Sequence, residues 1–339
     1  MKFITYTDWS QLPESANALF EQAGRDSLFL SRQWFECLTS ALDHDSMLLA
    51  CVVDDRDALA ILPLQRSDSN TGYALKHRYS AFYSLLLTAD DQQRVLACLL
   101  EGLDQLSLNA LLLEPVSEDD VRLKTLQSSM ETAGYTCERV FRFYNWYLRV
   151  QGQSFAEYMA ARPAHLRNTI ARKQRKLERE HGYEIRLVTG AEVPPKMADY
   201  YAVYTASWKA NEQYASLVND LVAKFSQPGW TRLAVLYIKG QPAAAQLWFV
   251  HHGKASIFRL SYDQAWKQYS PGSILMAYLM AYVIDSDKVE EVDFLTGNDA
   301  YKQDWMSDRR QRFAWSAVKP VAPASWYAQF VALLKRLLQ

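Results

Sequence analysis

The stretch Ser256–Trp305 decides the fold of this chain: SIFRLSYDQAWKQYSPGSILMAYLMAYVIDSDKVEEVDFLTGNDAYKQDW. Apolar and polar residues alternate over 256–262, which is typical of a strand. An apolar run over 274–284 is long enough for about three turns of helix. A second, short strand is predicted over 289–295, before a Gly-Asn-Asp turn. The order is therefore strand, polar loop, helix and strand.

The polar loop between the first strand and the helix ends in Ser270-Pro271-Gly272-Ser273. A glycine turn that opens a helix directly after a strand leaves backbone N–H groups aimed at an anion, so this turn is a candidate seat for a pyrophosphate. Because proline lacks an N–H, Pro271 leaves the seat one donor poorer. The residues predicted to hold the cofactor are Gln268, Ser270, Gly272 and Ser273.

This ordered set resembles the core of the GNAT acyltransferases, and more specifically the acyltransferase domain of the CelD-like, Fem-related proteins. Their pattern of S-P-G, helix, D-F-x-x-G and Y-K-x-x-W is matched by Ser270-Pro271-Gly272, Asp293-Phe294…Gly297 and Tyr301-Lys302…Trp305. The resemblance implies that the turn holds acetyl-CoA or another acyl-CoA, with the acyl chain between the two strands. It also implies an α+β (mixed α/β) fold of two tandem GNAT-like domains, each a mixed, mostly antiparallel sheet flanked by helices.

Length and composition describe an ordinary globular protein. The 339 residues suffice for two domains of about 150–200 residues each. With 49% hydrophobic residues and a net charge of −1, the chain has no global attraction to nucleic acid, so we expect no DNA partner. The apolar run 274–284 is too short to cross a bilayer, and no signal peptide opens the sequence. We therefore expect a cytoplasmic protein without a transmembrane segment.

The cysteines and histidines show no metal-binding spacing, so no metal is expected. Free thiols in a reducing compartment are predicted for Cys37, Cys51, Cys98 and Cys137. No Ser-His-Asp order, Walker-type glycine loop or zincin helix occurs either.

Two similar hairpins divide the chain. The segments MLLACVVDDRDALAILPL (47–64) and RLAVLYIKGQPAAAQLWF (232–249) align without gaps, each an apolar strand, a polar turn and an Ala-rich returning strand. Together with the family resemblance, this favours duplication. We expect a first domain over residues 1–150 and a second over 151–339. Because the first has no counterpart to Ser270-Pro271-Gly272 or to Asp293…Tyr301-Lys302, we expect it to be non-catalytic and the second to be catalytic.

A basic segment over residues 162–181, RPAHLRNTIARKQRKLEREH, opens the second domain and is predicted to be helical. Arg172, Arg175, Lys176 and Arg179 fall at spacings of three and four residues and share a face. One interpretation is a solvated amphipathic helix, and the other is an electropositive rim for an anionic ligand. In Fem-type aminoacyltransferases a helical element is associated with aminoacyl-tRNA delivery, so tRNA is a possible partner.

Acyl transfer to an amine requires a neutral amine, a polarised carbonyl and a proton donor for the leaving group. The resemblance places a tyrosine general acid at Tyr301, for which packing under the sheet is the alternative. Asp293 interrupts an apolar strand, where aspartate is disfavoured, and is a second catalytic candidate. Substrate contacts are predicted for Arg259, Tyr262, Asp263 and Lys302.

The expected function is transfer of an acyl group, acetyl in the first instance, from acyl-CoA to an amine acceptor, in polysaccharide or cell-envelope metabolism. The alternatives are a Fem-like aminoacyltransferase that uses aminoacyl-tRNA and a catalytically inactive binding or assembly protein. The amphipathic segment 325–339 is expected to pack on its domain or to lie on a membrane surface as a peripheral contact.

Overall fold

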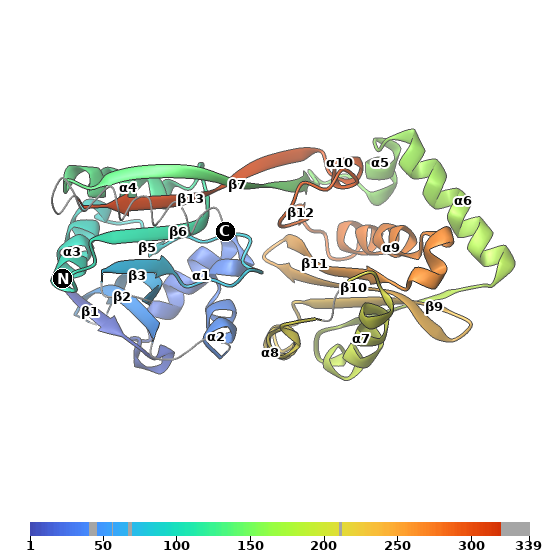
Figure 1. Ribbon diagram of the computed structural model, residues 1–339, viewed down its shortest axis with the longest axis horizontal. Helices are drawn as coiled ribbons and strands as arrows, with labels where there is room; N and C mark the ends of the chain where they lie inside the picture. Colours follow the sequence, from blue (N-terminus) through green and yellow to red (C-terminus); the bar gives the residue numbers. More distant parts are fainter. Residues whose placement is uncertain (41–45, 56, 67–69, 210–211, 320–339) are drawn as a thin grey trace. The chain divides into compact units, whose positions relative to one another are not determined.

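The computed structural model describes residues 1–40, 46–55, 57–66, 70–209 and 212–319 (Figure 1). The tail segment 325–339, for which packing or a membrane contact was expected, lies outside these residues. The chain divides into two compact units: Tyr144–Arg310 forms one, and Met1–Phe143 with the residues from Gln311 onward forms the other. Both boundaries fall inside strands, so the units do not follow a single cut in the chain.

The unit Tyr144–Arg310 contains a mixed sheet in the order β7-β12-β11-β10-β9-β8. Its strands are β7 (Thr136–Arg149, from Tyr144 onward), β8 (Glu184–Thr189), β9 (Thr231–Ile238), β10 (Gln241–His251), β11 (Lys254–Tyr262) and β12 (Glu291–Asp293). Its α-helices are α5 (Phe155–Ala160), α6 (Ala164–Glu180), α7 (Met197–Ala206), α8 (Ala215–Ser226), α9 (Pro271–Asp285) and α10 (Lys302–Trp305). Short 3₁₀ helices are η4 (Gly190–Glu192), η5 (Pro194–Lys196) and η6 (Gln264–Tyr269).

Helix α9 forms the core of this unit. Its sequence is apolar nearly all round, and it packs on β9, β10 and β11, while α7 and α8 cover the opposite face (Figure 1). Strands β9 and β10 are buried along almost their whole length because helices lie on both faces, which explains their continuous apolar sequence.

The other unit has the strands β1 (Lys2–Tyr6), β2 (Met47–Asp54), β3 (Asp57–Arg66), β4 (Thr71–Ala74), β5 (Leu86–Leu87), β6 (Ala110–Ser117) and the part of β13 (Asp308–Val318) that follows Arg310. Its helices are α1 (Ala16–Asp26), α2 (Arg32–Ser40), α3 (Gln92–Gln105) and α4 (Val121–Thr132), with the 3₁₀ turns η1 (Trp9–Gln11) and η2 (Leu28–Leu30). Over the parts of the chain that the structure describes, no helix is both long and apolar enough to span a membrane.

The two units repeat one order of strand pairings. In the first, β1, β2, β3 and β4 pair successively antiparallel, and β4 pairs parallel with β6. In the second, β8, β9, β10 and β11 do the same, and β11 pairs parallel with β12. Two helices precede the second strand of each set, and one helix (α3 or α9) forms the parallel crossover. The aligned hairpins of the sequence, β2–β3 and β9–β10, occupy equivalent positions in this scheme.

In each unit, one strand pairing joins residues that are far apart in the sequence. Strand β6 pairs antiparallel with β13, from Ala110 with Val318 to Ser117 with Arg312. Strand β12 pairs antiparallel with β7, which follows α4 in the chain. The sheet of the unit that begins at Met1 is therefore completed by residues that follow the whole of the other unit in the chain, whereas β7 from Tyr144 onward begins the run of its own unit.

The expected fold class is confirmed, since mixed and mostly antiparallel sheets are flanked by helices. None of the four cysteines forms a disulfide within the part of the chain that the structure describes, and Cys37 and Cys51 are buried. The basic segment 162–181, which was predicted to be helical, forms α6 from Ala164 to Glu180, with Pro163 at its N-cap. Strands β4, β5 and β13 were not predicted.

Candidate active site

Strand β11 leaves part of one edge uncovered. Its pairing with β12 consists of Lys254 with Glu291, Ala255 with Val292 and Ser256 with Asp293, while β11 continues to Tyr262. Beyond Ser256, β11 is paired along its other edge with β10. The two parallel strands therefore part at Ser256 and Asp293.

The hydrogen-bond pattern identifies which backbone groups face that uncovered edge. The N–H of Asp263 donates to the carbonyl of Ala243 on the β10 side at 2.8 Å. Because backbone groups alternate in direction along a strand, Ser261 also faces β10, whereas Leu260 and Tyr262 face the opposite edge. We call the backbone of residues 257–262 on that side the open edge of β11. It offers N–H and C=O groups to an extended ligand.

The turn Ser270-Pro271-Gly272-Ser273, which we call the cofactor turn, lies beside the end of β11. Ser270 has a left-handed backbone (φ 52°) and precedes α9, whose first residue is Pro271. A side chain added at Gly272 would place its Cβ 3.2 Å from Cδ1 of Tyr262, so turn and strand end are in contact. On the sheet side, Gln246 Nε2 donates to the Gly272 carbonyl at 2.9 Å and fixes the start of the helix.

The donors of this turn are fewer than a glycine-rich loop would offer. Pro271 has no N–H, and the N–H groups of Ser273 and Ile274 donate to the Ser270 carbonyl at 3.0 and 3.2 Å. Gln268 is exposed on η6, and its carbonyl accepts a hydrogen bond from Lys173 Nζ. The N–H of Gly272 is thus the principal backbone donor at the N-terminus of α9.

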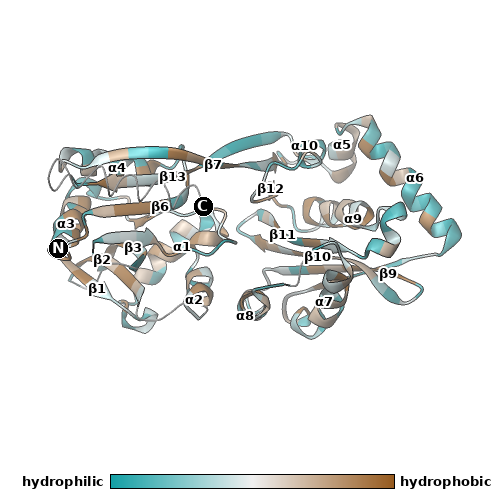
Figure 2. Cartoon of the chain, viewed as in Figure 1, coloured by the Kyte–Doolittle hydropathy of each residue, from teal (hydrophilic) through white to brown (hydrophobic). Residues whose placement is uncertain are grey.

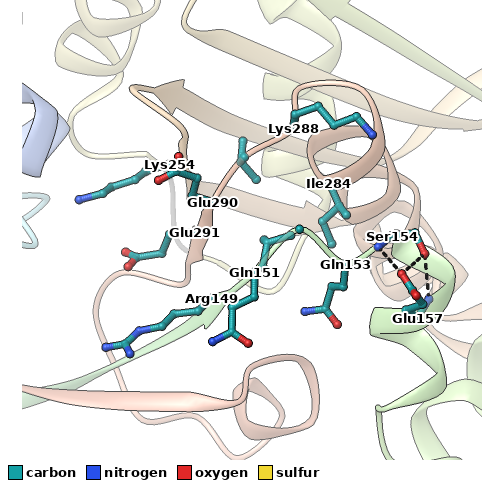
Figure 3. Close-up of a pocket in the computed structure, with 13 residues that line it drawn as sticks. Arg149, Gln151, Gln153, Ser154, Glu157, Lys254, Ile284, Lys288, Glu290 and Glu291 are labelled. Atoms are coloured by element: carbon teal, nitrogen blue, oxygen red, sulfur yellow. Dashed lines mark hydrogen bonds between the residues drawn. The ribbon is translucent and has the colours of Figure 1, made fainter.

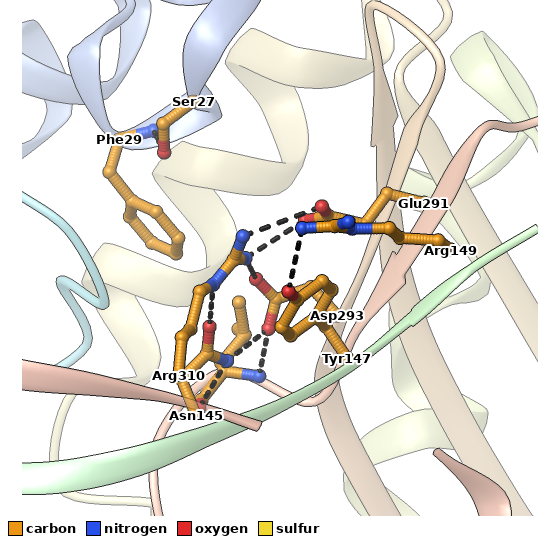
Figure 4. A network of polar contacts seen from close by, with 9 residues as sticks. Ser27, Phe29, Asn145, Tyr147, Arg149, Glu291, Asp293 and Arg310 are labelled. Atoms are coloured by element: carbon orange, nitrogen blue, oxygen red, sulfur yellow. Dashed lines mark hydrogen bonds and ion pairs between the residues drawn. The ribbon is translucent and has the colours of Figure 1, made fainter. Parts of the chain in front are cut away.

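Asp293 lies in a network of charges and amides contributed by β12, β7 and β13 (Figure 4). Its Oδ2 accepts from Arg310 Nη2 at 2.5 Å, and its Oδ1 accepts from Asn145 Nδ2 at 2.5 Å and from the Leu295 N–H at 2.6 Å. Arg310 also contacts Glu291 at 2.8 Å. Burial alone would lower the pKa of Arg310, but the carboxylates of Asp293 and Glu291 outweigh it and raise that pKa. Both oxygens of Asp293 are engaged, which favours a positioning role.

Tyr301 and Lys302 follow the turn after β12. The Tyr301 side chain is partly exposed (43%), and its ring meets that of Phe294 edge-on at 5.7 Å. Partial burial, with a contribution from Asp299, raises the pKa of Tyr301 to about 12. Its phenol is therefore protonated at neutral pH, as a proton donor must be.

Lys302 is buried and points back under the same turn. Its Nζ donates to the Thr296 carbonyl at 2.5 Å and pairs with Asp299 at 3.3 Å, so it is not the ion-pair partner of Asp293. Burial lowers the pKa of Lys302, although the charge of Asp299 opposes the shift.

The predicted substrate residues lie on and after β11. Arg259 pairs with Glu212 at 3.1 Å, as expected for a charge in mid-strand. The ring of Tyr262 lies 4.7 Å from that of Trp208. Asp263 caps η6 by accepting from the Ala265 N–H at 2.9 Å, which gives it a structural role at the end of β11.

The basic helix α6 packs against η6 and thus borders the cofactor turn. Lys176 Nζ lies 5.0 Å from the centre of the Tyr269 ring, and the Tyr269 hydroxyl contacts His181 Nε2 at 2.8 Å and Glu180 at 2.9 Å. The helix is strongly hydrophilic in Figure 2. Its exposed side carries Arg167, Arg172, Arg175 and Arg179, which we call the arginine face.

A cavity of about 620 Å³ opens at the other, paired end of β11 and β12 (Figure 3). Cations and acids line it together, among them Arg149, Lys254, Lys288 and Glu290. None of the residues predicted for the site lines this cavity.

The structure therefore brings the predicted residues together in two groups. Tyr262 and Gly272 meet at the end of β11, while Tyr301 and Lys302 both contact Phe294, the neighbour of Asp293. The sequence analysis missed Asn145, Glu291 and Arg310 around Asp293, and Lys209 and Glu212 beside β11. A charged residue in mid-strand, such as Arg259, was the one signal that could have directed attention to Glu212.

One family model matches a part of this chain. Residues 164–303 match the family model described as the acetyltransferase (GNAT) domain. The matched segment includes the open edge of β11, the turn before α9 and Asp293. No sequence among curated proteins matches the chain.

Solved structures share the fold at low sequence identity. FemX is 10% identical with a TM-score of 0.63, and the match covers 93% of this chain and 97% of FemX. L-PGS from Bacillus licheniformis is 12% identical with a TM-score of 0.54, over 86% and 89% of the chains. The C-terminal domain of a putative lysylphosphatidylglycerol synthetase from Agrobacterium fabrum is 14% identical with a TM-score of 0.52, over 81% and 85%.

Proposed function

We propose that this protein is an N-acyltransferase that transfers an acyl group, in the first instance acetyl, from acyl-CoA to an amine acceptor. The observation that carries the proposal is the separation of β11 from β12 after Ser256 and Asp293, within the segment that matches the acetyltransferase domain. The open edge of β11 offers N–H groups that would polarise the acyl carbonyl. Acceptor classes compatible with this chemistry are amino sugars, amino acids, polyamines and lipid precursors, with a role in polysaccharide or cell-envelope metabolism.

In this proposal the donor lies along the open edge, with its pyrophosphate at Gly272 and Ser273 and with Gln268 and Ser270 beside it. Tyr301 gives a proton to the leaving thiolate, and Asp293 holds β12 in register through Arg310. Arg259, Tyr262, Asp263 and Lys302 border the acceptor. The second half of the chain is catalytic, and the first is a GNAT-like copy without chemistry. Four cysteines without a disulfide among the described residues favour a reducing compartment such as the cytoplasm.

The alternative donor is aminoacyl-tRNA, as in the Fem-like enzymes. Two observations favour it: the backbone donors at the cofactor turn are few, and the arginine face lies on a helix that packs against the preceding η6. A polyanionic donor would gain from such a face. A third possibility is a binding or assembly protein without catalytic turnover. The same small number of backbone donors at the cofactor turn favours it.

Thermal-shift measurements with acetyl-CoA, longer acyl-CoAs and CoA test the proposal. A ligand that binds the folded state raises the melting temperature by mass action, by an amount that grows with its concentration. We expect acetyl-CoA to raise it more than adenosine diphosphate does, since the pantetheine arm also contacts the open edge. No shift with any CoA species, together with retention of charged tRNA on a filter, would favour the Fem-like alternative.

A further inference from the structure

Lys209 is held in a defined position just beyond α7. The Ser207 hydroxyl accepts from the Lys209 N–H at 3.2 Å and itself donates to the Tyr204 carbonyl at 2.7 Å, which fixes the turn after the helix. From there the Lys209 side chain reaches β11, where its Nζ donates to the Leu260 carbonyl at 2.5 Å. Leu260 faces the open edge, so the amine of Lys209 lies on the stretch of β11 that no other described strand covers.

Two aromatic rings and one ion pair surround this amine. The rings of Tyr204 and Trp208 both lie 5.5 Å from Nζ. From β11 the guanidinium of Arg259 faces it, and Glu212, which is almost fully buried, pairs with that guanidinium. Tyr200 and Tyr201, on α7, lie close to the same ion pair.

These neighbours favour the neutral amine. Burial, and secondarily the charge of Arg259, lower the pKa of Lys209 to about 8, while Glu212 acts in the opposite direction. A lysine whose pKa is close to the working pH is suited to accept a proton.

We propose that Lys209 is the general base that removes a proton from the acceptor ammonium group at the open edge of β11. This inference rests on the proposed acyltransferase function. The neutral Lys209 amine takes one proton from the acceptor, and the freed nitrogen lone pair forms a C–N bond to the acyl carbonyl carbon. The C–S bond then breaks, Tyr301 gives its phenolic proton to the leaving sulfur, and the second amine proton returns the phenol to its neutral form. The products are the amide, CoA and the Lys209 ammonium, which returns its proton to water.

The test compares Lys209→Arg and Lys209→Met with the wild type, measuring CoA release from acetyl-CoA with glucosamine, alanine and spermidine as acceptors. Arginine keeps the positive charge and a hydrogen bond to the Leu260 carbonyl, but it does not lose its proton. Methionine removes both the charge and the hydrogen bond. We expect both variants to lose on the order of 10²-fold in kcat/KM for the amine at neutral pH, with little change in the KM for acetyl-CoA. Wild-type kcat/KM should rise with pH and bend near 8, and this bend should be absent from both variants.

An acceptor that is already neutral at pH 8, such as hydroxylamine, should recover most of the lost rate in both variants. Lys319→Met, which removes an amine paired with Asp104 in the other unit, is the matched control. Wild-type rates in Lys209→Arg, or a pH profile unchanged in Lys209→Met, would overturn the inference while leaving the proposed function standing. A wild type inactive with both acetyl-CoA and aminoacyl-tRNA would overturn the two together.

A measurement on the wild type covers the case in which neither variant folds. Trace labelling with acetic anhydride across a range of pH, read by mass spectrometry, gives the midpoint at which each lysine loses its proton. A midpoint for Lys209 near 8, well below that of Lys319, supports the inference. Equal midpoints for the two lysines would contradict it.

Discussion

The guanidinium of Arg310 lies 2.5 Å from Oδ2 of Asp293 and thereby joins the start of β13 to the last residue of β12. Asp293 is also the residue after which β12 parts from β11. The ion pair therefore holds β12 at the point where the open edge of β11 begins.

Replacing Asp293 by Asn should destabilise the protein without removing the shape of the side chain. The change leaves the largely buried Arg310 with Glu291 as its remaining carboxylate partner, and hydrogen bonds to charged groups contribute about 1.5–3 kcal/mol each. We expect the free energy of unfolding to fall by about 2 kcal/mol, measured by urea denaturation. Glu184→Gln, which breaks the exposed pair with Arg186, serves as control and should change little. An equal fall in the free energy of unfolding in both variants would show that the network around Asp293 stabilises the fold no more than an exposed ion pair does.

Tyr301→Phe should give a folded but slow enzyme. The substitution keeps the ring that packs on Phe294 and removes the proton that we assign to the leaving thiolate. We expect kcat to fall by about 10²–10⁴-fold with little change in KM, because a general acid acts in the transition state. Steady-state turnover and the melting temperature together separate this from a packing role, in which turnover would be normal.

The pH dependence of the wild type provides a second check on Tyr301. Since its pKa is raised to about 12, the phenol remains protonated well above the pH at which an ordinary tyrosine ionises. The rate should therefore not decline between about pH 8 and 10. A decline in that range that disappears in Tyr301→Phe would mean that the tyrosine ionises earlier than its surroundings imply.

Gly272→Glu should abolish binding of CoA while leaving the fold intact. A carboxylate at this position would lie at the N-terminus of α9, where the pyrophosphate is proposed, and would repel it. Gly272→Ala is the matched control: its Cβ meets Tyr262 at 3.2 Å, and a small shift of that ring accommodates it. Isothermal titration with acetyl-CoA should show at least a tenfold loss for the glutamate variant alone. Unchanged affinity would place the donor elsewhere.

Reversing the arginine face to glutamate at Arg167, Arg172, Arg175 and Arg179 distinguishes the two donors. Lys173 and Lys176 are left in place because they hold α6 to η6. If charged tRNA is the donor, its binding should weaken and the dependence of that binding on salt should become shallower. Filter binding at several salt concentrations measures both, with Arg94→Glu in the other unit as control. An unchanged salt dependence would leave α6 as a solvated helix.

Local patterns in the sequence were sufficient for most of the fold. The hairpins β2–β3 and β9–β10 each combine apolar strands with a short polar turn, and their pairing needs no distant information. The α9 crossover followed from its apolar run and the preceding proline. Strand β13 was missed because it begins with the charged run Asp308-Arg309-Arg310, and its pairing partner β6 is remote in the chain.

The candidate site was predictable only where its residues share a motif. Tyr301, Lys302 and Asp293 lie within a few residues of one another, and the structure indeed places them around Phe294. Asn145 and Arg310 reach Asp293 from strands far before and after it in the sequence. Lys209 belongs to a turn with no recognisable pattern, and its meeting with Leu260 depends on how α7 packs on the sheet.

The late position of β13 in the chain has a consequence for the order in which the protein is made. During synthesis the first unit emerges with β6 fully formed in sequence, yet its neighbour β13 leaves the ribosome only after the whole of residues 144–310. Until then β6, whose residues are all buried in the finished protein, presents an apolar edge to the cell. We therefore expect the nascent chain to depend on chaperones over that interval, and an arrested chain ending before residue 311 to aggregate.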